Sequence, residues 1–241
     1  MTVHSERAGA ALAHLGEADP ALAALALWIA HRDGDPLRSD GATIYYDAGF
    51  PLRPLPEQVG LAGHHILHVA FRHAARMAAM EVREGARFDP RRFNLAADAI
   101  VNEALLAAGH ALPRPAVRLQ ELLAVLGDAA VDPAAALADW DVERLYLALG
   151  AREATGGGET ETYARAKGFE PDLDPDRDGG GEDPDAADWQ GHLARALEVG
   201  RQAGRGIGRL AAALGDLPAP HVPWERQLRG LVARALGHRP Q

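Results

Sequence analysis

"PEQVGLAGHHILHVAFRHAARMAAMEVR", residues 56–83, is the stretch that decides the fold of this chain. Its apolar residues recur at helical spacing, and a proline and a glutamate suit the first turn, so it predicts one long helix. A second helix is predicted over 90–109, "PRRFNLAADAIVNEALLAAG", with Asp89 as its N-cap and Gly109 as its end. We expect these two helices to pack side by side.

The rest of the chain is also predicted to be helical, with one convincing strand. That strand is "ATIYY", residues 42–46, which is rich in β-branched and aromatic residues. Further helices are predicted over residues 4–16, 20–32, 118–126, 141–149, 188–202 and 223–236. The predicted fold class is therefore mainly α, that is α+β with one short sheet or edge strand, and we expect strand 42–46 to run along the site.

Composition restricts the classes of function. The 241 residues carry a net charge of -9 and show no basic stripe, which argues against a nucleic-acid partner. Cysteine is absent, so disulfides and thiolate ligands are excluded and any metal must be held by His, Asp or Glu. We see no signal peptide and no apolar run of membrane-spanning length, so we expect a cytoplasmic protein without a membrane partner. The richness in Ala, Arg, Gly and Pro is typical of a GC-rich bacterial gene.

The chain is expected to have three parts. Residues 1–153 form a helical domain, 154–187 form an acidic Gly/Asp-rich linker or mobile loop, and 188–241 form C-terminal helices that pack on the same domain. Within the linker, "DPDRDGGGEDPD", residues 174–185, fits a calcium-loop template in part. Its last position is Asp instead of Glu and a proline precedes it, so a linker is the preferred interpretation.

Two histidines four residues apart are the first sign of chemistry. His64 and His68 lie about 40° apart around a helix and one turn displaced, so their rings can converge on one ion. This is the spacing of the paired ligands in zinc peptidase helices. The chain holds eleven histidines, and such a pair also arises by chance in a structural helix.

The second helix offers a third ligand. Asn94, Asp98 and Asn102 recur every four residues and form a polar stripe on an apolar helix. A buried carboxylate is unfavourable unless it is paired or bound to a metal. Asp98 would complete a set of two histidines and one aspartate with a fourth position open for water, which is typical of catalytic zinc. Asn94 and Asn102 would orient ligands or contact substrate.

Other polar residues near the pair are given supporting roles. On a straight helix His73 faces about 180° away from His64, so it is expected to be structural or to orient a ligand. Arg72 and Arg76 lie nearer the metal-facing side. The alternative to a metal site is that Asp98 is buried as the ion-pair partner of Arg72 or Arg76.

The two helices resemble a known family. "GLAGHHILHVAFRHAAR" followed by "FNLAADAIVNEALL" is similar to the N-terminal domain of bacterial metallopeptidase-like proteins that are often joined to a von Willebrand factor A-like domain. That family reads HExLHxxxxHxxR and then N-x-A-x-D-x-x-x-N. The matching residues are His64, Leu67, His68, His73, Arg76, Asn94, Ala96, Asp98 and Asn102. The resemblance implies a zincin-like fold, zinc at one ion per chain, and a peptide or protein substrate.

Two departures from the family pattern affect the expected chemistry. The chain ends where the A-like domain would begin, so a separate A-like domain protein or an ATPase is the partner that the resemblance implies. His65 stands where the family carries the glutamate that moves protons. A neutral imidazole can accept a proton, but its protonated form is disfavoured beside Zn²⁺, so His65 as the catalytic base should lower the rate.

Three outcomes for His65 stay open at this point. The protein is a weak or altered metal-dependent hydrolase, or a metal-holding domain without hydrolysis, or a site in which His65 is itself a third nitrogen ligand. The expected function is therefore a zinc-binding metallopeptidase-like protein. The alternative is a catalytically inactive module that acts in binding or assembly with a partner protein.

Overall fold

The computed structural model describes residues 5–128, 132–156, 158–174 and 186–217. The α-helices are α1 Gly9–Ala18, α2 Pro20–Ala26, α3 Leu55–Ala70, α4 His73–Glu84, α5 Pro90–Ala108, α6 Leu119–Leu126, α7 Pro133–Asp139, α8 Val142–Ala154, α9 Glu159–Ala166 and α10 Ala186–Ala203. The strands are β1 Ala30–Asp33, β2 Arg38–Ser39 and β3 Thr43–Tyr46, and the 3-10 helices are η1 Phe50–Leu52, η2 Gly85–Arg87 and η3 Gly206–Ala213. The prediction of a mainly α fold with a short sheet is confirmed.

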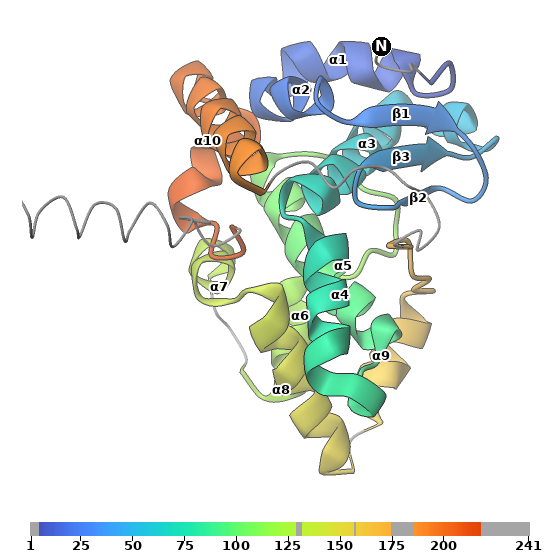
Figure 1. The fold of residues 1–241 in the computed structure, drawn as a ribbon, viewed down its shortest axis with the longest axis vertical. Coiled ribbons are helices and arrows are strands. Elements are labelled where there is room, and N and C mark those ends of the chain that lie inside the picture. Colours follow the sequence, from blue (N-terminus) through green and yellow to red (C-terminus); the bar gives the residue numbers. More distant parts are fainter. Residues whose placement is uncertain (1–4, 129–131, 157, 175–185, 218–241) are drawn as a thin grey trace, which may run out of the picture.

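The two helices that carry the polar motifs lie in the middle of the molecule. In Figure 1, α1, α2 and the sheet lie at one end, α8 and α9 lie at the other, and α3 and α5 connect the two ends. Helix α3 packs against α1, α2 and α5, whereas α5 also contacts α6, α7, α8 and η3. The expected side-by-side packing of the two motif helices is therefore observed.

Helix α5 forms as its sequence predicts. The Asp89 carboxylate accepts the backbone N–H of Arg92 at 3.1 Å, and Gly109 ends the helix with a left-handed φ of 93°. Every residue from Phe93 to Leu105 is buried. The polar stripe of α5 therefore lies inside the core and must find partners there.

The predicted single helix over 56–83 is wrong, because the chain breaks between α3 and α4. Arg72 adopts a left-handed conformation with φ 57° and ψ 37°, the only positive φ outside glycine among the described residues. Such a conformation ends the α-helical path and redirects the chain. His73 therefore does not continue on the far side of α3, as it would on a straight helix.

A glycine allows a loop to approach α3 closely. A Cβ atom on Gly60 would lie 1.8 Å from the carbonyl oxygen of Ala111, a distance that no side chain can tolerate. The loop that follows α5 therefore packs directly on the α3 backbone, one turn before His64. This contact helps to form the wall of the site described below.

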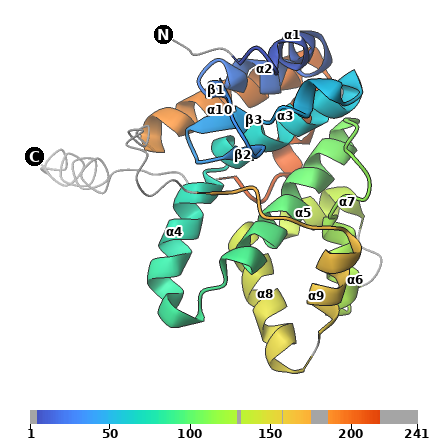
Figure 2. The same cartoon turned by 90° about the vertical axis from the view of Figure 1, so that its right-hand side faces the viewer.

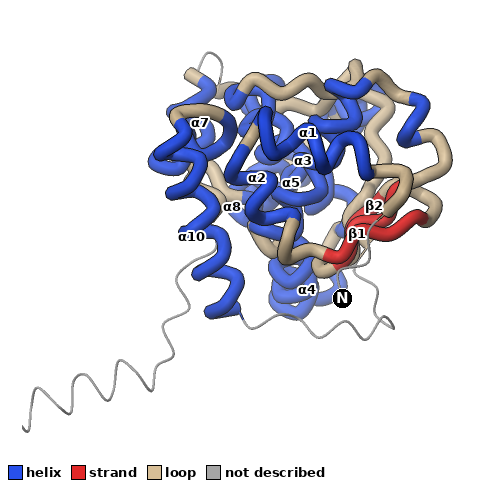
Figure 3. The backbone as a smooth tube through the Cα atoms, turned by 90° about the horizontal axis from the view of Figure 1, so that it is seen from above, coloured by secondary structure: helices blue, strands red, loops and turns tan. Residues whose placement is uncertain are grey.

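The sheet differs from the sequence expectation at its first strand. The predicted helix over 20–32 is wrong at its end, since α2 stops at Ala26 and residues 30–33 form β1. Strand β3 agrees with the predicted strand and lies in the centre, parallel to β1 and antiparallel to β2. The apolar run before β1 suits either structure, and pairing with β3 decides between them. Figure 3 shows the sheet on one side of the helices.

Part of the expected linker is ordered. Residues Glu159–Ala166 form α9, and the chain then runs past α5 toward β2 (Figure 2). There Ser39 of β2 donates its N–H to Asp172 O at 2.9 Å and accepts the N–H of Asp174 at 3.0 Å. This pairing draws residues 167–174 onto the body of the molecule.

Two sequence predictions lie outside the described residues. These are most of the calcium-loop candidate at 174–185 and the helix at 223–236. Before them, α10 packs on α2 and η3 packs on α5. Within the described part of the chain, no helix has the length and apolar character needed to cross a membrane.

Candidate metal centre

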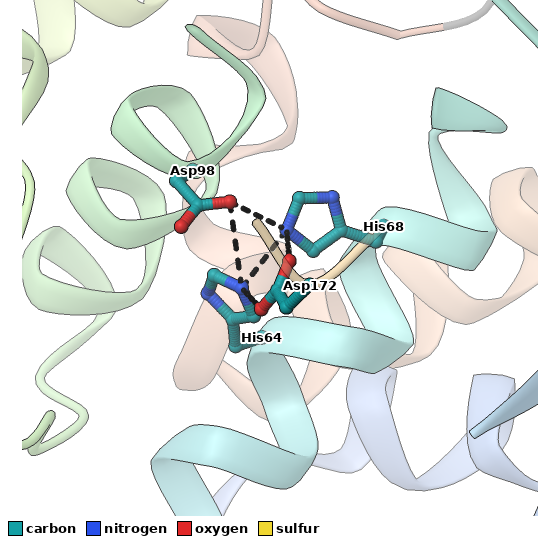
Figure 4. Close-up of side chains that lie close together, drawn as sticks. All are labelled: His64, His68, Asp98 and Asp172. Carbon is teal, nitrogen blue, oxygen red and sulfur yellow. Dashed lines mark hydrogen bonds and ion pairs between the residues drawn. The ribbon is translucent and has the colours of Figure 1, made fainter. Parts of the chain in front are cut away.

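Four side chains from three segments converge in the interior. His64 and His68 come from α3, Asp98 comes from α5, and Asp172 comes from the segment after α9 (Figure 4). One ligand atom from each lies within 4.8 Å of every other, and this is the only such group of three or more among the described residues. The structure thus brings together the three predicted ligands and adds Asp172, which the sequence analysis missed.

The His64 ring is fixed in one tautomer. Its Nδ1 lies 2.8 Å from Asn102 Oδ1, and the amide nitrogen of Asn102 donates to Val117 O at 3.1 Å. This second bond sets the amide so that its oxygen faces His64, and the histidine must then donate from Nδ1. In the neutral ring the lone pair is on Nε2, which points into the cluster.

The His68 ring is fixed in the same way by a longer chain of bonds. His73 Nε2 lies 2.6 Å from Asp216 Oδ2, so this nitrogen carries the proton and donates to the carboxylate. A neutral His73 is then an acceptor at Nδ1, which lies 2.9 Å from His68 Nδ1. His68 therefore donates from Nδ1, and its Nε2 lone pair also points into the cluster.

The two Nε2 atoms consequently face each other at 2.9 Å. Two neutral rings fixed in these tautomers would place lone pair against lone pair, which is unfavourable. A proton or a cation between or beside these nitrogens removes the conflict. The hydrogen bonds at the two Nδ1 atoms therefore favour a proton or a cation beside the two Nε2 atoms.

The carboxylates complete the surroundings of that position. Asp98 Oδ1 lies 3.4 Å from His68 Nε2 and 3.9 Å from His64 Nε2, and Asp172 Oδ2 lies 2.9 Å from His64 Nε2. Oδ1 of Asp98 and Oδ1 of Asp172 are buried without a hydrogen-bond partner among the described residues. Buried polar atoms of this kind need an explanation, and an unseen ion is one of the usual ones.

The electrostatics of the cluster favour a positive charge at its centre. Burial alone would lower the pKa of His64, but Asp172 and Asp98 outweigh it and raise that pKa to about 9. Burial and the charge of Asp172 raise the pKa of Asp98, whereas nearby histidines hold the pKa of Asp172 low against the effect of burial. Without a metal, protons therefore occupy the position that a cation would take.

The spacing of the ligand atoms fits a small divalent ion. Bonds of about 2.0–2.2 Å in a tetrahedron place neighbouring ligand atoms roughly 3.3–3.6 Å apart. The nearest measured separations in the cluster run from 2.9 to 3.9 Å and bracket this range. Two imidazoles and two carboxylates form a donor set that suits zinc and other first-row metals.

His65 is buried beside the cluster but outside it. Its ring is fully buried and T-shaped against His64, and its Nε2 lies 3.8 Å from Asp172 Oδ2. Neither ring nitrogen has a hydrogen-bond partner among the described residues. Burial lowers the pKa of His65 to about 4, so the ring is neutral at pH 7.

Two of the predicted residues, His73 and Arg76, belong to a separate network together with Glu143 and Asp216, which the sequence analysis did not identify. We call His73, Arg76, Glu143 and Asp216 the paired network. Arg76 donates to Glu143 Oε1 at 2.8 Å and to Asp216 Oδ1 at 2.7 Å, and Asp216 Oδ1 also accepts the Val142 N–H. Asp98 does not pair with Arg76; its measured ion pairs are to His64 and His68. Arg72, the left-handed residue before α4, lines a separate cavity together with Arg76 and Glu143.

Asn94 explains how Asp172 reaches the cluster. Asn94 Oδ1 accepts the N–H of Leu173 at 2.9 Å, and its Nδ2 donates to Pro90 O. The neighbouring apolar residues Phe169 and Leu173 are both buried. The signal that could have found Asp172 is therefore these two apolar side chains flanking it in an otherwise acidic stretch.

A cavity of about 180 Å³ opens beside the four side chains. Its wall includes His64, Asp98 and Asp172. The rest of the lining comes mainly from the loop after α5 and from the segment after α9. His65 does not line it, so any small molecule that enters meets Asp172 and His64 instead.

Comparison with known proteins gives one match. The family model described as "Putative metallopeptidase domain" matches residues 3–241. No curated protein and no solved structure matches the chain.

Proposed function

The chain belongs to this metallopeptidase domain family, and we propose that it binds one zinc ion and acts as a metal-dependent hydrolase of peptides. In this proposal His64, His68 and Asp98 hold the ion, a fourth position stays open for water, and Asp172 lies beside that position. The observation that carries it is the pair of Nε2 atoms 2.9 Å apart, each with its lone pair directed inward by an external acceptor.

Zinc would supply two things at this position, a water of lowered pKa and a Lewis acid that polarises a substrate carbonyl. The chain supplies the surroundings. Asn102 and the His73–Asp216 pair keep the two histidines in the binding tautomer. Asn94 holds the backbone of Leu173 and so fixes the neighbouring carboxylate.

We infer that Asp172 takes the role of the glutamate that the family pattern carries at the position of His65. It lines the cavity, and its side chain is 20% exposed, so it can contact a molecule there. The nearby histidines lower its pKa, which keeps it deprotonated but weakens it as a base until a metal displaces their protons. His65 is fully buried and cannot reach a molecule in the cavity. In this proposal the proton acceptor comes from a different segment than in the family pattern, and His65 is a buried neighbour of His64.

Metal analysis of purified protein tests the binding step. The expected result is about one zinc per chain in the wild type and loss of zinc in His64→Ala and His68→Ala, because two remaining ligands hold zinc poorly. His14→Ala, in α1 away from the cluster, is the matched control and should keep the metal. A wild type that binds no zinc, cobalt or manganese would overturn the proposal.

The acceptor role is tested by exchanging carboxylates. Asp172→Asn should keep zinc and lower hydrolysis of a generic peptide by about 10²–10⁴-fold. In the same background His65→Glu should restore part of the rate, since a carboxylate then returns to the family position. His65→Ala should keep the metal.

Two results would change the assignment. Loss of zinc in Asp172→Asn would make Asp172 a fourth ligand, and the site would then be closed and structural. The chain would in that case be a non-catalytic binding module. Loss of zinc in His65→Ala would make His65 a ligand.

A further inference from the structure

A second cavity, of about 460 Å³, lies between α4 and the start of α8, and we call it the α4–α8 cavity. A benzene-sized ring needs about 150 Å³, so this cavity has room for roughly three apolar side chains. Its lining comes from α4, from the start of α8 and from the segment after η3: Arg72, Ala75, Arg76, Ala79, Asp141, Glu143, Gly215 and Leu217. The cavity is separate from the candidate metal centre.

Helix α4 has apolar residues on two opposite faces. Met77 and Met80 are buried and belong to the face that packs on the body of the molecule. Ala75, Ala79 and Val82 recur at helical spacing on the other face, and all three are exposed, Val82 at 86%. A surface helix normally carries polar residues on that face. The exposed face of α4 is therefore apolar and uncovered by the described part of the chain.

Helix α8 adds a further apolar side chain on its side. Leu147 is 46% exposed and lies one turn after Glu143, so it shares the face of α8 that borders the cavity. Apolar side chains of two helices thus flank one hollow, and exposed apolar surface of this kind marks an interaction site.

The chain itself leads a further segment to this hollow. Leu217 lines the cavity and is the last residue that the structure describes, and residues 218–241 follow it. Trp224 lies seven residues further on, so an extended chain carries it up to roughly 23 Å from Leu217. The exposed face of α4 from Ala75 to Val82 spans only about 10 Å, so all of it is within reach.

The sequence of that segment suits the cavity. Trp224, Leu228 and Leu231 recur at i, i+4 and i+7, which is the apolar stripe of the helix predicted over 223–236. Residues 218–241 hold four arginines and one glutamate, whereas the whole chain has a net charge of -9, so the segment and the rest of the chain attract each other. The family model also extends over this segment, to residue 241.

We propose that residues 223–236 dock as an amphipathic helix in the α4–α8 cavity, with Trp224 against the exposed face of α4. The covalent link through Leu217 gives the segment a high effective concentration there. The docked helix covers Arg76 and Glu143, whose side chains are 17% and 28% exposed without it. It thus shields the paired network from water.

Paramagnetic broadening in the full chain tests the contact, because the chain has no cysteine and only four tryptophans. A nitroxide on Ala79→Cys should broaden the indole N–H NMR signal of Trp224, which Trp224→Phe identifies by its loss. Leu52→Cys is the matched control, since Leu52 is exposed and precedes the opposite end of α3. A nitroxide there should leave the Trp224 signal sharp.

Two results of this measurement would overturn the proposal. If the nitroxide on Ala79→Cys leaves the Trp224 signal sharp, the segment does not fill the cavity, and another protein is the remaining candidate. Mixing isotope-labelled protein without nitroxide with unlabelled protein that carries it detects contacts between copies. The same broadening in this mixture would assign the cavity to a second copy of the chain.

Stability measurements give an independent test that needs no label. Ala79→Arg keeps a good helix former but places a charge on the docking face, so it should lower the midpoint of urea unfolding. In the Trp224→Ala background the same change should have no effect, because the segment is already released. Ala194→Arg, at an exposed position of α10, is the matched control and should change neither background. Equal losses from Ala79→Arg in both backgrounds would overturn the proposal.

Discussion

Two buried polar clusters lie next to each other in this protein, and they differ in how completely their polar groups are hydrogen-bonded. In the paired network, Arg76 and His73 meet Glu143 and Asp216, and the Asp216 oxygens accept from Arg76, His73 and Val142. In the candidate metal centre, buried oxygens of Asp98 and Asp172 lack hydrogen-bond partners among the described residues. The adjacent His65 ring lacks them as well.

The difference distinguishes a structural cluster from a candidate binding site. A network whose donors and acceptors are matched within the chain needs no further partner and holds elements together. A cluster with unmatched acceptors around two inward lone pairs is complete only with a positive partner. The two clusters touch through a single contact, the hydrogen bond between His68 and His73.

The largest expected effect is in the paired network. Asp216→Ala should lower the free energy of unfolding by about 3–5 kcal/mol, because it leaves buried cationic and N–H groups without their partner. Urea unfolding of metal-free protein measures it. Asp47→Ala removes a more exposed pair with Arg53 and should cost only about 0–1 kcal/mol. Similar losses in both variants would contradict the comparison.

The next largest effect is the stabilisation that zinc gives at the candidate metal centre. Zinc at about 100 times its dissociation constant should raise the free energy of unfolding by about 2.7 kcal/mol in the wild type and by nothing in His64→Ala. His64 has a pKa raised to about 9, so below that pH it holds a proton that zinc must displace. The affinity for zinc should therefore weaken as the pH falls below about 9. Zinc titrations at several pH values check the sign. An affinity that does not change with pH would mean that the histidines are not ligands.

His65 and His73 are both fully buried, and replacing each by leucine should change the free energy of unfolding by different, smaller amounts. His73→Leu in metal-free protein should lower stability by about 1.5–3 kcal/mol, since its bond to the Asp216 carboxylate is lost. His65→Leu removes two unpartnered ring nitrogens and should leave stability unchanged or raise it by about 1 kcal/mol. A loss in His65→Leu as large as that in His73→Leu would show that His65 has a partner in solution.

The smallest effect is confined to acid pH. Despite its burial, interactions with His73 and Arg76 hold the pKa of Asp216 below its ordinary value of 3.8. A depressed folded-state pKa gives stability that is present above the unfolded value and is lost as pH falls through the folded value. The wild type should therefore lose more stability below pH about 4 than Asp216→Asn does. Parallel curves for the two proteins would contradict this.

The sequence by itself determined helix α5, the helical faces of the motif residues and three of the four candidate ligands. The i,i+4 pair His64 and His68 and the stripe around Asp98 are local patterns, and helical periodicity turns them into faces without reference to the rest of the chain. Asp89 and Gly109 set the ends of α5 through local capping. These features could therefore be predicted, and so could the mainly α fold class.

Only the tertiary structure decided how the site is completed. The left-handed Arg72 breaks the long helix and brings His73 against His68, and no local rule requires a non-glycine residue to adopt that conformation. Asp172 joins the cluster from more than a hundred residues away in sequence, because Ser39 and Asn94 bind the backbone around it. Contacts at such separation depend on the packing of the whole chain. For that reason the sequence indicated Asp98, but not Asp172, as a carboxylate of the candidate site.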